Sequence, residues 1–432
     1  MWELFEQGEL PRWVKVRQRL YNAALADVAA AVAAEFAQPG VRAAIRPGQR
    51  VALTGGSRGI DRIDQVLRAA AAEVRKLGGE PFVVPAMGSH GGATAAGQCA
   101  VLAEYGITEA AIGCPIRASM DTDLLGYIDD QPVAGGTARV PVWFDATAHR
   151  QADVVIPIGR VKPHTDFHGA IESGLMKMVA IGLGKQKGAD TFHSYGFTEF
   201  HRLIPAVARF TLAQGQIPFG LALLEDGHGR LAHVEAVPTP QIEVREQELL
   251  QLAREWMPRL PGERIDVLIV DAIGKDISGI GADTNVVNRY YGQALEFLPR
   301  IQRLVVRGLT PATEGNATGI GLFDVALRRV IERIDYASTY MNVVTAKAPE
   351  GARLPIMVDT DRQALRVALA CCLRVESASA RIVRIRDTKH LEEFWASEPL
   401  LPELLATGRV ELLHAIEDIA FDESDMFKDD II

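Results

Sequence analysis

Cysteine is scarce in this sequence, and none of its four cysteines stands in a C-x-x-C spacing. So few cysteines in a chain of 432 residues exclude a disulfide framework and fit a reducing compartment. We therefore expect a cytoplasmic protein. The cysteines are Cys99, Cys114, Cys371 and Cys372.

Segments that would direct the chain to or through a membrane are also missing. The first residues lack a basic region followed by an apolar core, which argues against a signal peptide. The alanine-rich stretch of residues 23–34 is interrupted by Asp27, so it predicts a helix of a soluble fold. Basic residues number 46 against 55 acidic ones, and the net charge of −9 repels phosphate backbones. We expect neither a membrane nor a nucleic acid as a partner.

The length of 432 residues exceeds what one hydrophobic core usually organises, so we expect two domains. Short apolar runs, each followed by a glycine-rich turn and a helical pattern, are typical of parallel βαβ units. A long helical pattern ends at Trp256, which places the boundary near residue 260. We predict two α/β domains with mostly parallel sheets, residues 1–260 and 261–432, with a frayed acidic C-terminus. The predicted strands are Arg50–Thr54, Pro81–Ala86, Asp153–Ile158, Ile265–Val270, Arg303–Val306, Leu354–Val358 and Ala380–Ile385.

A glycine-rich turn after the first of these strands is similar to the nucleotide-binding turn of short-chain dehydrogenases. Backbone N–H groups in such a turn can approach a phosphate, so Gly55, Gly56 and Ser57 are candidate ligand-binding residues. The last glycine of that family's pattern is Asp61 here, and no tyrosine is followed by lysine four residues later. These differences exclude the dehydrogenase reaction. Phosphate binding and an ordinary tight turn both remain open.

Lys177 lies in an apolar helical pattern, Ser173-Gly-Leu-Met-Lys-Met-Val-Ala-Ile181. Small residues at positions 173 and 174 would leave space beside the lysine stem, because helical side chains lean toward the N-terminus. A lysine partly removed from water can serve as a nucleophile or an attachment point. The simpler alternative is a lysine that extends its ammonium group to water from an apolar face.

Polar residues follow several predicted strands. Arg58, His90 and His164 each come after a strand, and loops at the carboxyl ends of parallel strands form the ligand crevice of α/β folds. A single loop histidine is usually a turn or capping residue. The convergence of three such residues is what indicates a site.

At these positions the sequence resembles the nickel-dependent lactate racemase family. The resemblance rests on the G-S-H-G-G-A-T turn with His90, on Lys162-Pro-His164, and on the spacing between Lys177 and His193. It is clearest from about residue 50 to 195. It implies that residues 1–260 form a cofactor-binding domain and that the active site lies in the cleft between the two domains.

The resemblance also implies a cofactor, the nickel-pincer nucleotide (pyridinium-3,5-bisthiocarboxylic acid mononucleotide with nickel). By analogy with the family, Lys177 would hold it covalently through a thioamide, and His193 would be the protein ligand of the nickel. One imidazole that completes a square-planar nickel site is sound coordination chemistry. Arg58 and its glycine turn would bind either the nucleotide phosphate or the substrate.

The implied reaction is the racemisation of a 2-hydroxy acid by reversible hydride transfer. Hydrogen must leave C2 and return to either face, which requires a hydride acceptor with a base on each side. His90 and His164 would be these bases, because an imidazole with a pKa near 6.5 serves in either protonation state at neutral pH.

The sequence departs from the family around the expected substrate. The family's Tyr-Gln-x-x-Lys stretch is replaced by a segment that ends in Arg289 and Tyr290, so Arg289 or Lys275 would take the place of its lysine. The loop after His164 is longer and adds Asp166 and His168, which makes His168 a further substrate-binding candidate. We therefore expect a 2-hydroxy acid other than lactate.

Two other functions remain open at this stage. The chain could be an epimerase of sugar acids with the same cofactor, or a non-catalytic relative that binds a small acid or a nucleotide. The implied partners are a small-molecule substrate and the proteins that synthesise the cofactor. Whether the chain forms a homodimer is open.

Overall fold

The computed structural model describes residues 8–57, 59–290, 293–294 and 297–428 of the chain. Its contacts divide the chain into two compact units. The N-terminal unit is Tyr21–Met257, and the C-terminal unit joins the segment up to Leu20 with the chain from Pro258 on. The strand β1 (Arg12–Gln18) therefore belongs to the C-terminal unit, whereas the sequence pattern had grouped it with residues 1–260.

The predicted runs at residues 50–54, 81–86 and 153–158 form strands of the N-terminal unit, namely β2, β3, and β6 with β7. The sequence pattern had not predicted β8 and β9, which pair antiparallel. In its central sheet β2 lies between β3 and β6, and both pairings are parallel. Val51, Ala52 and Leu53 of β2 are fully buried, as expected for a strand that is covered on both faces. Pro157 separates β6 from β7, which pairs in parallel with β8. The strands are β2 (Arg50–Gly55), β3 (Glu80–Pro85), β6 (Val154–Ile156), β7 (Ile158–Arg160), β8 (Phe219–Glu225) and β9 (Leu231–Pro238).

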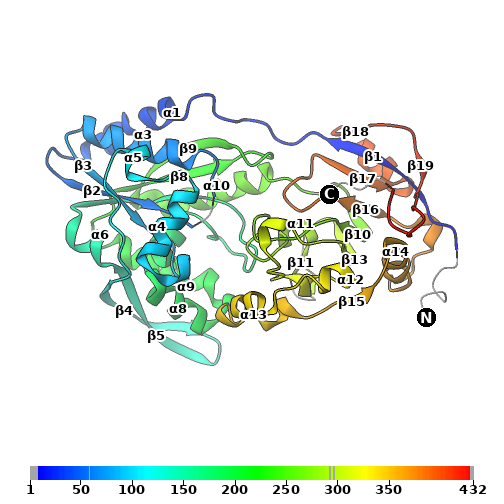
Figure 1. Cartoon of the computed structure of the whole chain (residues 1–432). Coiled ribbons are helices and arrows are strands. Elements are labelled where there is room, and N and C mark those ends of the chain that lie inside the picture. Colours follow the sequence, from blue (N-terminus) through cyan, green and yellow to red (C-terminus); the bar gives the residue numbers. More distant parts are fainter. Residues whose placement is uncertain (1–7, 58, 291–292, 295–296, 429–432) are drawn as a thin grey trace. The chain divides into compact units, whose positions relative to one another are not determined.

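Helices pack on these strands, with α3 against β2 and β3 and α10 against β8 (Figure 1). The sequence pattern had not predicted the antiparallel hairpin of β4 (Thr122–Val133) and β5 (Gly136–Asp145). The helices are α1 (Val28–Phe36), α2 (Pro39–Ala43), α3 (Ile63–Lys76), α4 (Ala95–Glu104), α5 (Glu109–Ile112), α6 (Ala146–Gln151), α7 (Leu175–Lys177), α8 (Lys185–Tyr195), α9 (Phe200–Leu212) and α10 (Ile242–Trp256), with a π-helical turn at Met178–Gly182.

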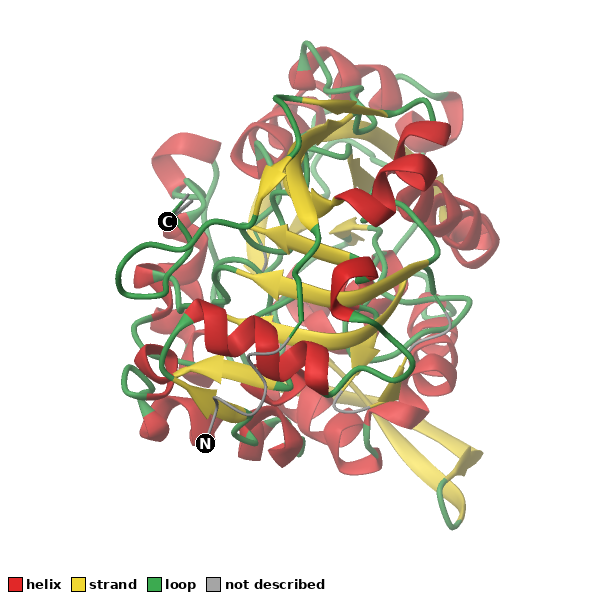
Figure 2. Cartoon of the chain, turned by 90° about the vertical axis from the view of Figure 1, so that its right-hand side faces the viewer, coloured by secondary structure: helices red, strands yellow, loops and turns green. Residues whose placement is uncertain are grey.

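The C-terminal unit contains a mixed sheet in the order β15-β14-β13-β10-β16-β17-β1-β18, with β19 beside β1. The strands from β15 to β16 are parallel, and the rest pair antiparallel. Figure 2 shows helices lying against these strands. The α/β class is therefore confirmed. The strands are β10 (Arg264–Val270), β11 (Arg289–Tyr290), β12 (Gln293–Ala294), β13 (Arg300–Val306), β14 (Val325–Leu327), β15 (Ile356–Val358), β16 (Ile382–Ile385), β17 (Glu393–Ser397), β18 (Val410–Leu412) and β19 (Glu417–Asp418); the helices are α11 (Thr284–Val287), α12 (Arg328–Ile331), α13 (Tyr336–Thr345), α14 (Asp361–Ala370) and α15 (Leu401–Ala406).

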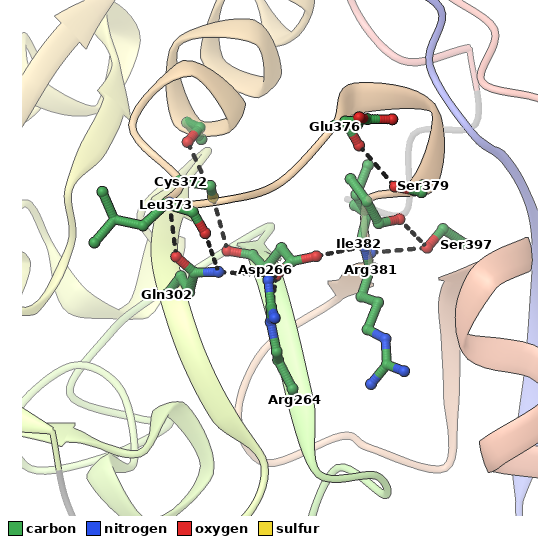
Figure 3. Close-up of polar contacts among 12 residues, drawn as sticks. Arg264, Asp266, Gln302, Cys372, Leu373, Glu376, Ser379, Arg381, Ile382 and Ser397 are labelled. Atoms are coloured by element: carbon green, nitrogen blue, oxygen red, sulfur yellow. Dashed lines mark hydrogen bonds and ion pairs between the residues drawn. The ribbon is translucent and has the colours of Figure 1, made fainter.

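The buried carboxylate of Asp266, near the N-terminal end of β10, connects this strand to two neighbouring segments. Asp266 of β10 accepts hydrogen bonds from Gln302 of β13 at 3.0 Å and from the backbone N–H of Arg381 at 2.9 Å (Figure 3). The thiol of Cys372 donates to the backbone oxygen of Asp266 at 3.4 Å. Burial and the nearby Asp266 carboxylate raise the pKa of Cys372 to about 12, so this thiol stays protonated and structural.

The C-terminal end does not fray as predicted, as far as residue 428. Phe427 is buried, its ring lies 5.2 Å from that of Trp13, and its N–H donates to Asp361 at 2.9 Å. Two apolar anchors, Phe421 and Phe427, thus hold an acidic segment that composition alone would leave in solvent. In the described part of the chain, every helix is too short or too polar to cross a membrane.

Candidate active site

Three turns of the N-terminal unit follow the carboxyl ends of its strands and pack on one helical segment. They follow β2, β3 and β7 and carry Gly56, His90 and His164 respectively. The N–H of Gly88 donates to the oxygen of Gly182 at 3.4 Å, and a Cβ on Gly56 would lie 3.2 Å from Met178 Cε. This edge of a parallel sheet is where α/β proteins bind ligands, so we take it as the candidate active site.

Hydrogen bonds connect the two ends of the loop that contains His164, and a buried glutamate binds the loop from within. Its ends, Lys162 and Ser173, exchange two backbone hydrogen bonds of 3.0 and 3.3 Å. The buried carboxylate of Glu172 accepts the N–H of His164 at 2.6 Å, and Arg254 of α10 donates to it at 2.6 Å. The loop is therefore tied to the helix beneath it.

Glu172 performs this role as an anion. Burial alone would raise its pKa, but hydrogen bonds from His168 and from the N–H groups of His164 and Gly169 outweigh burial. The pKa of Glu172 therefore lies below its ordinary value. Sequence reasoning missed this residue, whose only local signal is a glutamate in a histidine-rich stretch.

An aromatic cluster of Phe167, Phe192, Phe197 and Phe200 brings three predicted site residues together. The ring of His164 lies 4.4 Å from that of Phe167, and the Nζ atom of Lys177 lies 5.8 Å from the same ring. Phe167 in turn lies 5.4 Å from Phe200, on which the ring of His193 stacks at 5.8 Å and 12°. Two imidazoles and an amine thus surround one pair of aromatic rings.

Hydrogen bonds hold the two candidate bases in opposite tautomers. Nδ1 of His90 lies 2.9 Å from the oxygen of Met87, which can only accept, so Nδ1 carries a proton. Nδ1 of His164 instead accepts the N–H of Asp166 at 3.0 Å, so the neutral ring carries its proton on Nε2. A carboxylate oxygen of Asp166 lies 3.5 Å from the same Nδ1 and would stabilise the imidazolium form.

The helix of Lys177 differs from the one predicted. It begins at Leu175, makes one α-helical turn to Lys177 and continues as a π-helical turn, a feature that is frequent at functional sites. Ser173 lies outside the helix, in the bridge to Lys162. The prediction that Ser173 and Gly174 make room for the lysine stem is therefore wrong.

Gly174 makes room for a buried glutamate instead. Glu246 of α10 accepts the N–H of Met176 at 3.0 Å, which satisfies a backbone donor at the start of the Lys177 helix. The pKa of Glu246 is raised to about 7, because the effect of burial outweighs that of the hydrogen bonds from Met176 and Leu175, which lower the pKa. A Cβ on Gly174 would lie 2.5 Å from both Cδ and Oε1 of Glu246.

Gly174→Ala is therefore expected to lower the free energy of unfolding by about 1–3 kcal/mol, through overpacking against Glu246. Gly188→Ala is the matched control, because a Cβ there would make only ordinary contacts, 3.6 Å from the oxygen of Ala180. Urea denaturation of both variants measures the difference. Equal stabilities would contradict the tight fit at Gly174.

The turn of His90 contacts the helix that carries His193. A Cβ on Gly88 would lie 3.4 Å from the Cβ of Ala189 in α8. Ala189 and His193 are four residues apart and so share one face of this helix. His90 itself is exposed at the surface, whereas His193 is half-buried.

The glycine turn has structural reasons for its small residues. A Cβ on Gly55 would lie 2.7 Å from Cδ2 of Leu102, and the oxygen of Ser57 accepts the hydroxyl of Tyr105 at 3.0 Å. Asp61 accepts the N–H of Leu231 at 2.9 Å, which explains the acidic residue where dehydrogenases have glycine. Arg58 lies outside the described residues.

The remaining candidates are positioned by local contacts. His168 lies 3.4 Å from Glu172 through Nδ1. In the C-terminal unit, Arg289 donates to Asp324 at 2.6 Å and to the oxygen of Gln302 at 2.7 Å, and the N–H of Lys275 donates to Thr313 at 3.2 Å. Their role toward a substrate stays a prediction. Within the described ranges, no three His, Cys, Asp or Glu side chains are grouped to hold a metal ion.

Comparisons with known proteins agree with the fold and leave the chemistry open. Residues 63–236, fewer than half of the chain, match a family described as a domain of unknown function, DUF362. A structural-genomics target from Thermotoga maritima is similar over 79% of this chain and 89% of its own, with a TM-score of 0.52 and 11% identity. The lactate racemase apoprotein from Thermoanaerobacterium thermosaccharolyticum is similar over 87% and 94%, with a TM-score of 0.49 and 12% identity. A search of curated proteins found no match.

Proposed function

We propose that this protein is an isomerase that racemises or epimerises a 2-hydroxy acid, with a nickel-pincer nucleotide attached to Lys177. The observation that carries the proposal is the grouping of Lys177, His164 and His193 around Phe167 and Phe200. A buried face of aromatic rings with one amine and two imidazoles provides an attachment point, a metal ligand and a proton carrier. The substrate is a 2-hydroxy acid other than lactate.

The donor set fits such a cofactor. Lys177 would hold the organic part through its amine, and the imidazole of His193, in the same cluster, would bind the nickel. A metal with a single protein ligand takes its other donors from the organic group, and sulfur and nitrogen donors suit nickel. When bound, this group would accept and return a hydride. Gly55, Gly56 and Ser57, with Arg58, are proposed to bind its phosphate or the substrate carboxylate.

His90 and His164 would move the hydroxyl proton of the substrate. The neutral form of His90 protonated on Nδ1 has its basic lone pair on Nε2, which would accept that proton. His164 starts from the opposite tautomer, in which Nε2–H donates. Asp166 would stabilise either form of His164, through its N–H when the ring is neutral and through its carboxylate when the ring is charged. A pair of such imidazoles can exchange roles between the two directions of reaction.

The test is to co-express the protein with the proteins that synthesise the cofactor and to map the modification of Lys177 by peptide mass spectrometry, with nickel counted alongside. We expect a modified Lys177, about one nickel per chain, and racemisation of one or more members of a 2-hydroxy acid panel that includes sugar acids. Lys177→Arg should lose the adduct completely. Lys187→Arg should keep it, because Lys187 is exposed and its Nζ lies over Trp143 at 4.8 Å.

An active lactate racemase prepared in parallel controls for cofactor supply. The proposal would be refuted if Lys177 is unmodified and no nickel is bound while the control enzyme carries its cofactor. It would favour instead a protein that binds a small acid or a nucleotide without catalysis.

A further inference from the structure

A lysine without any exposed surface lies behind the candidate active site. Lys185 is fully buried, and its Nζ atom lies 2.8 Å from Oδ2 of Asp145, which is fully buried as well. Nζ also donates to the oxygen of Pro85, at the end of β3. A buried ammonium group with a carboxylate and a carbonyl as partners is a structural cation and not a nucleophile.

The same lysine reaches the turn of His90 through one intermediate side chain. Oε1 of the buried Gln98 accepts from Lys185 Nζ at 3.4 Å. Nε2 of Gln98 donates to the oxygen of Gly88 at 3.0 Å and to that of His90 at 3.3 Å. The lysine fixes which way the amide faces, because only its oxygen can accept from an ammonium group. The amide nitrogen is thereby directed at the two carbonyls of the turn.

Lys185 is also the first residue of α8, the helix that carries His193. Its backbone has φ = 54°, in the left-handed region that a residue with a side chain adopts only when its surroundings require it. The ion pair with Asp145 and the hydrogen bonds to Pro85 and Gln98 supply such surroundings. The start of the His193 helix and the turn of His90 are thus bound to one buried charge.

We infer that Lys185 and Gln98 are positioning residues that fix His90 relative to His193. Hydrogen bonds and ion pairs in the interior hold side chains in place, and proton transfer is sensitive to displacements of about 1 Å. Their importance for catalysis rests on the proposed function of the two histidines. The connection between Lys185, Gln98 and the turn of His90 does not depend on that function, because hydrogen bonds and an ion pair define it.

Gln98→Met tests the link with little change in volume. It removes both hydrogen bonds to the turn and leaves the ion pair between Lys185 and Asp145 in place. Gln216→Met is the matched control, because Nε2 of Gln216 also donates to two backbone oxygens, of His149 at 3.0 Å and of Ala152 at 3.2 Å. Both glutamines belong to the N-terminal unit, so unfolding of that unit would change the His90 signal in either variant.

The first readout is the Cε1–H signal of His90 in protein with labelled histidine, assigned with His90→Gln. Gln98→Met should broaden or split this signal, and Gln216→Met should leave it unchanged. The second readout is the activity of the loaded enzyme, for which we expect kcat to fall roughly tenfold to a hundredfold with little change in KM. A Gln98→Met protein that matches Gln216→Met in both readouts would overturn the inference. If the wild-type protein carries no adduct on Lys177, the proposed function fails, and the signal of His90 still decides on the link.

Discussion

Lys185→Met is expected to lower the free energy of unfolding of the N-terminal unit by about 3–5 kcal/mol, because it leaves a charge without a partner in the interior. The carboxylate of Asp145 is fully buried and lies 2.8 Å from the ammonium group that the variant lacks. Several kcal/mol is a large part of the stability of an ordinary domain, so part of the protein should be unfolded or aggregated on expression. Urea denaturation followed by circular dichroism measures the change.

A double-mutant cycle separates the uncompensated charge from the loss of packing. Asp145→Asn keeps the acceptor that caps α6 through the N–H of Ala148 at 2.8 Å, but it removes the negative charge. Lys185→Met combined with Asp145→Asn should therefore lose less stability than Lys185→Met alone. Lys187→Met, two residues along the same helix, should cost less than about 1 kcal/mol, because its cation lies over Trp143 at the surface. A Lys185→Met protein as stable as Lys187→Met would refute the structural role of the pair.

The sequence predicted the sheet edge of the site because strands leave a strong local signal. The apolar runs at residues 50–54 and 81–86 became β2 and β3, and the turns after them hold Gly56 and His90 as expected. The grouping of His164, Lys177 and His193 also followed from the resemblance of their spacing to a known family. These inferences needed only local pattern and chain order.

The buried ionic residues around the site could not be predicted in the same way. Lys185 stands in the polar stretch Lys185-Gln-Lys187, and nothing local distinguishes the buried lysine from the exposed one. Its partner Asp145 is forty residues earlier in sequence, at the end of a hairpin that the pattern had missed. Pairing between distant residues is a property of the tertiary fold.

Glu246 is a different case, because a local signal existed. It occupies the buried face of α10 together with Ile242, Leu249 and Leu250, at the helical spacing of apolar positions. A glutamate on such a face requires a partner, and the partner is the start of the Lys177 helix.

β1 was grouped with the wrong unit for a simpler reason, since chain order does not reveal that an N-terminal strand pairs with the C-terminal sheet.

Glu246 should make the stability of the N-terminal unit depend on pH in a direction opposite to that of an ordinary paired carboxylate. Its pKa is raised from 4.5 to about 7, mainly by burial and with a further contribution from the charge of Glu243. Between these two values the folded protein binds a proton that the unfolded chain releases, so stability falls as the pH rises from about 4.5 to about 7. The difference between the two pKa values corresponds to about 3 kcal/mol. Above pH 7 this cost is constant.

Glu246→Gln removes the titration and keeps an oxygen that can accept the N–H of Met176. The stability of this variant relative to the wild type should rise by about 3 kcal/mol between pH 4.5 and pH 8, whatever the amide costs at low pH. Glu172 and Glu235 have lowered pKa values, so their contributions to stability rise with pH instead of falling. Both proteins contain these carboxylates, so their contributions cancel in the difference. Glu255→Gln, on the exposed face of the same helix, should show no such trend. Urea midpoints at several pH values, with hydrogen exchange of the amides of Leu175 and Met176, give the measurement. A flat difference for Glu246→Gln would mean that Glu246 stays ionised in the folded protein, and the N-terminus of the Lys177 helix would then be capped by an anion at every working pH.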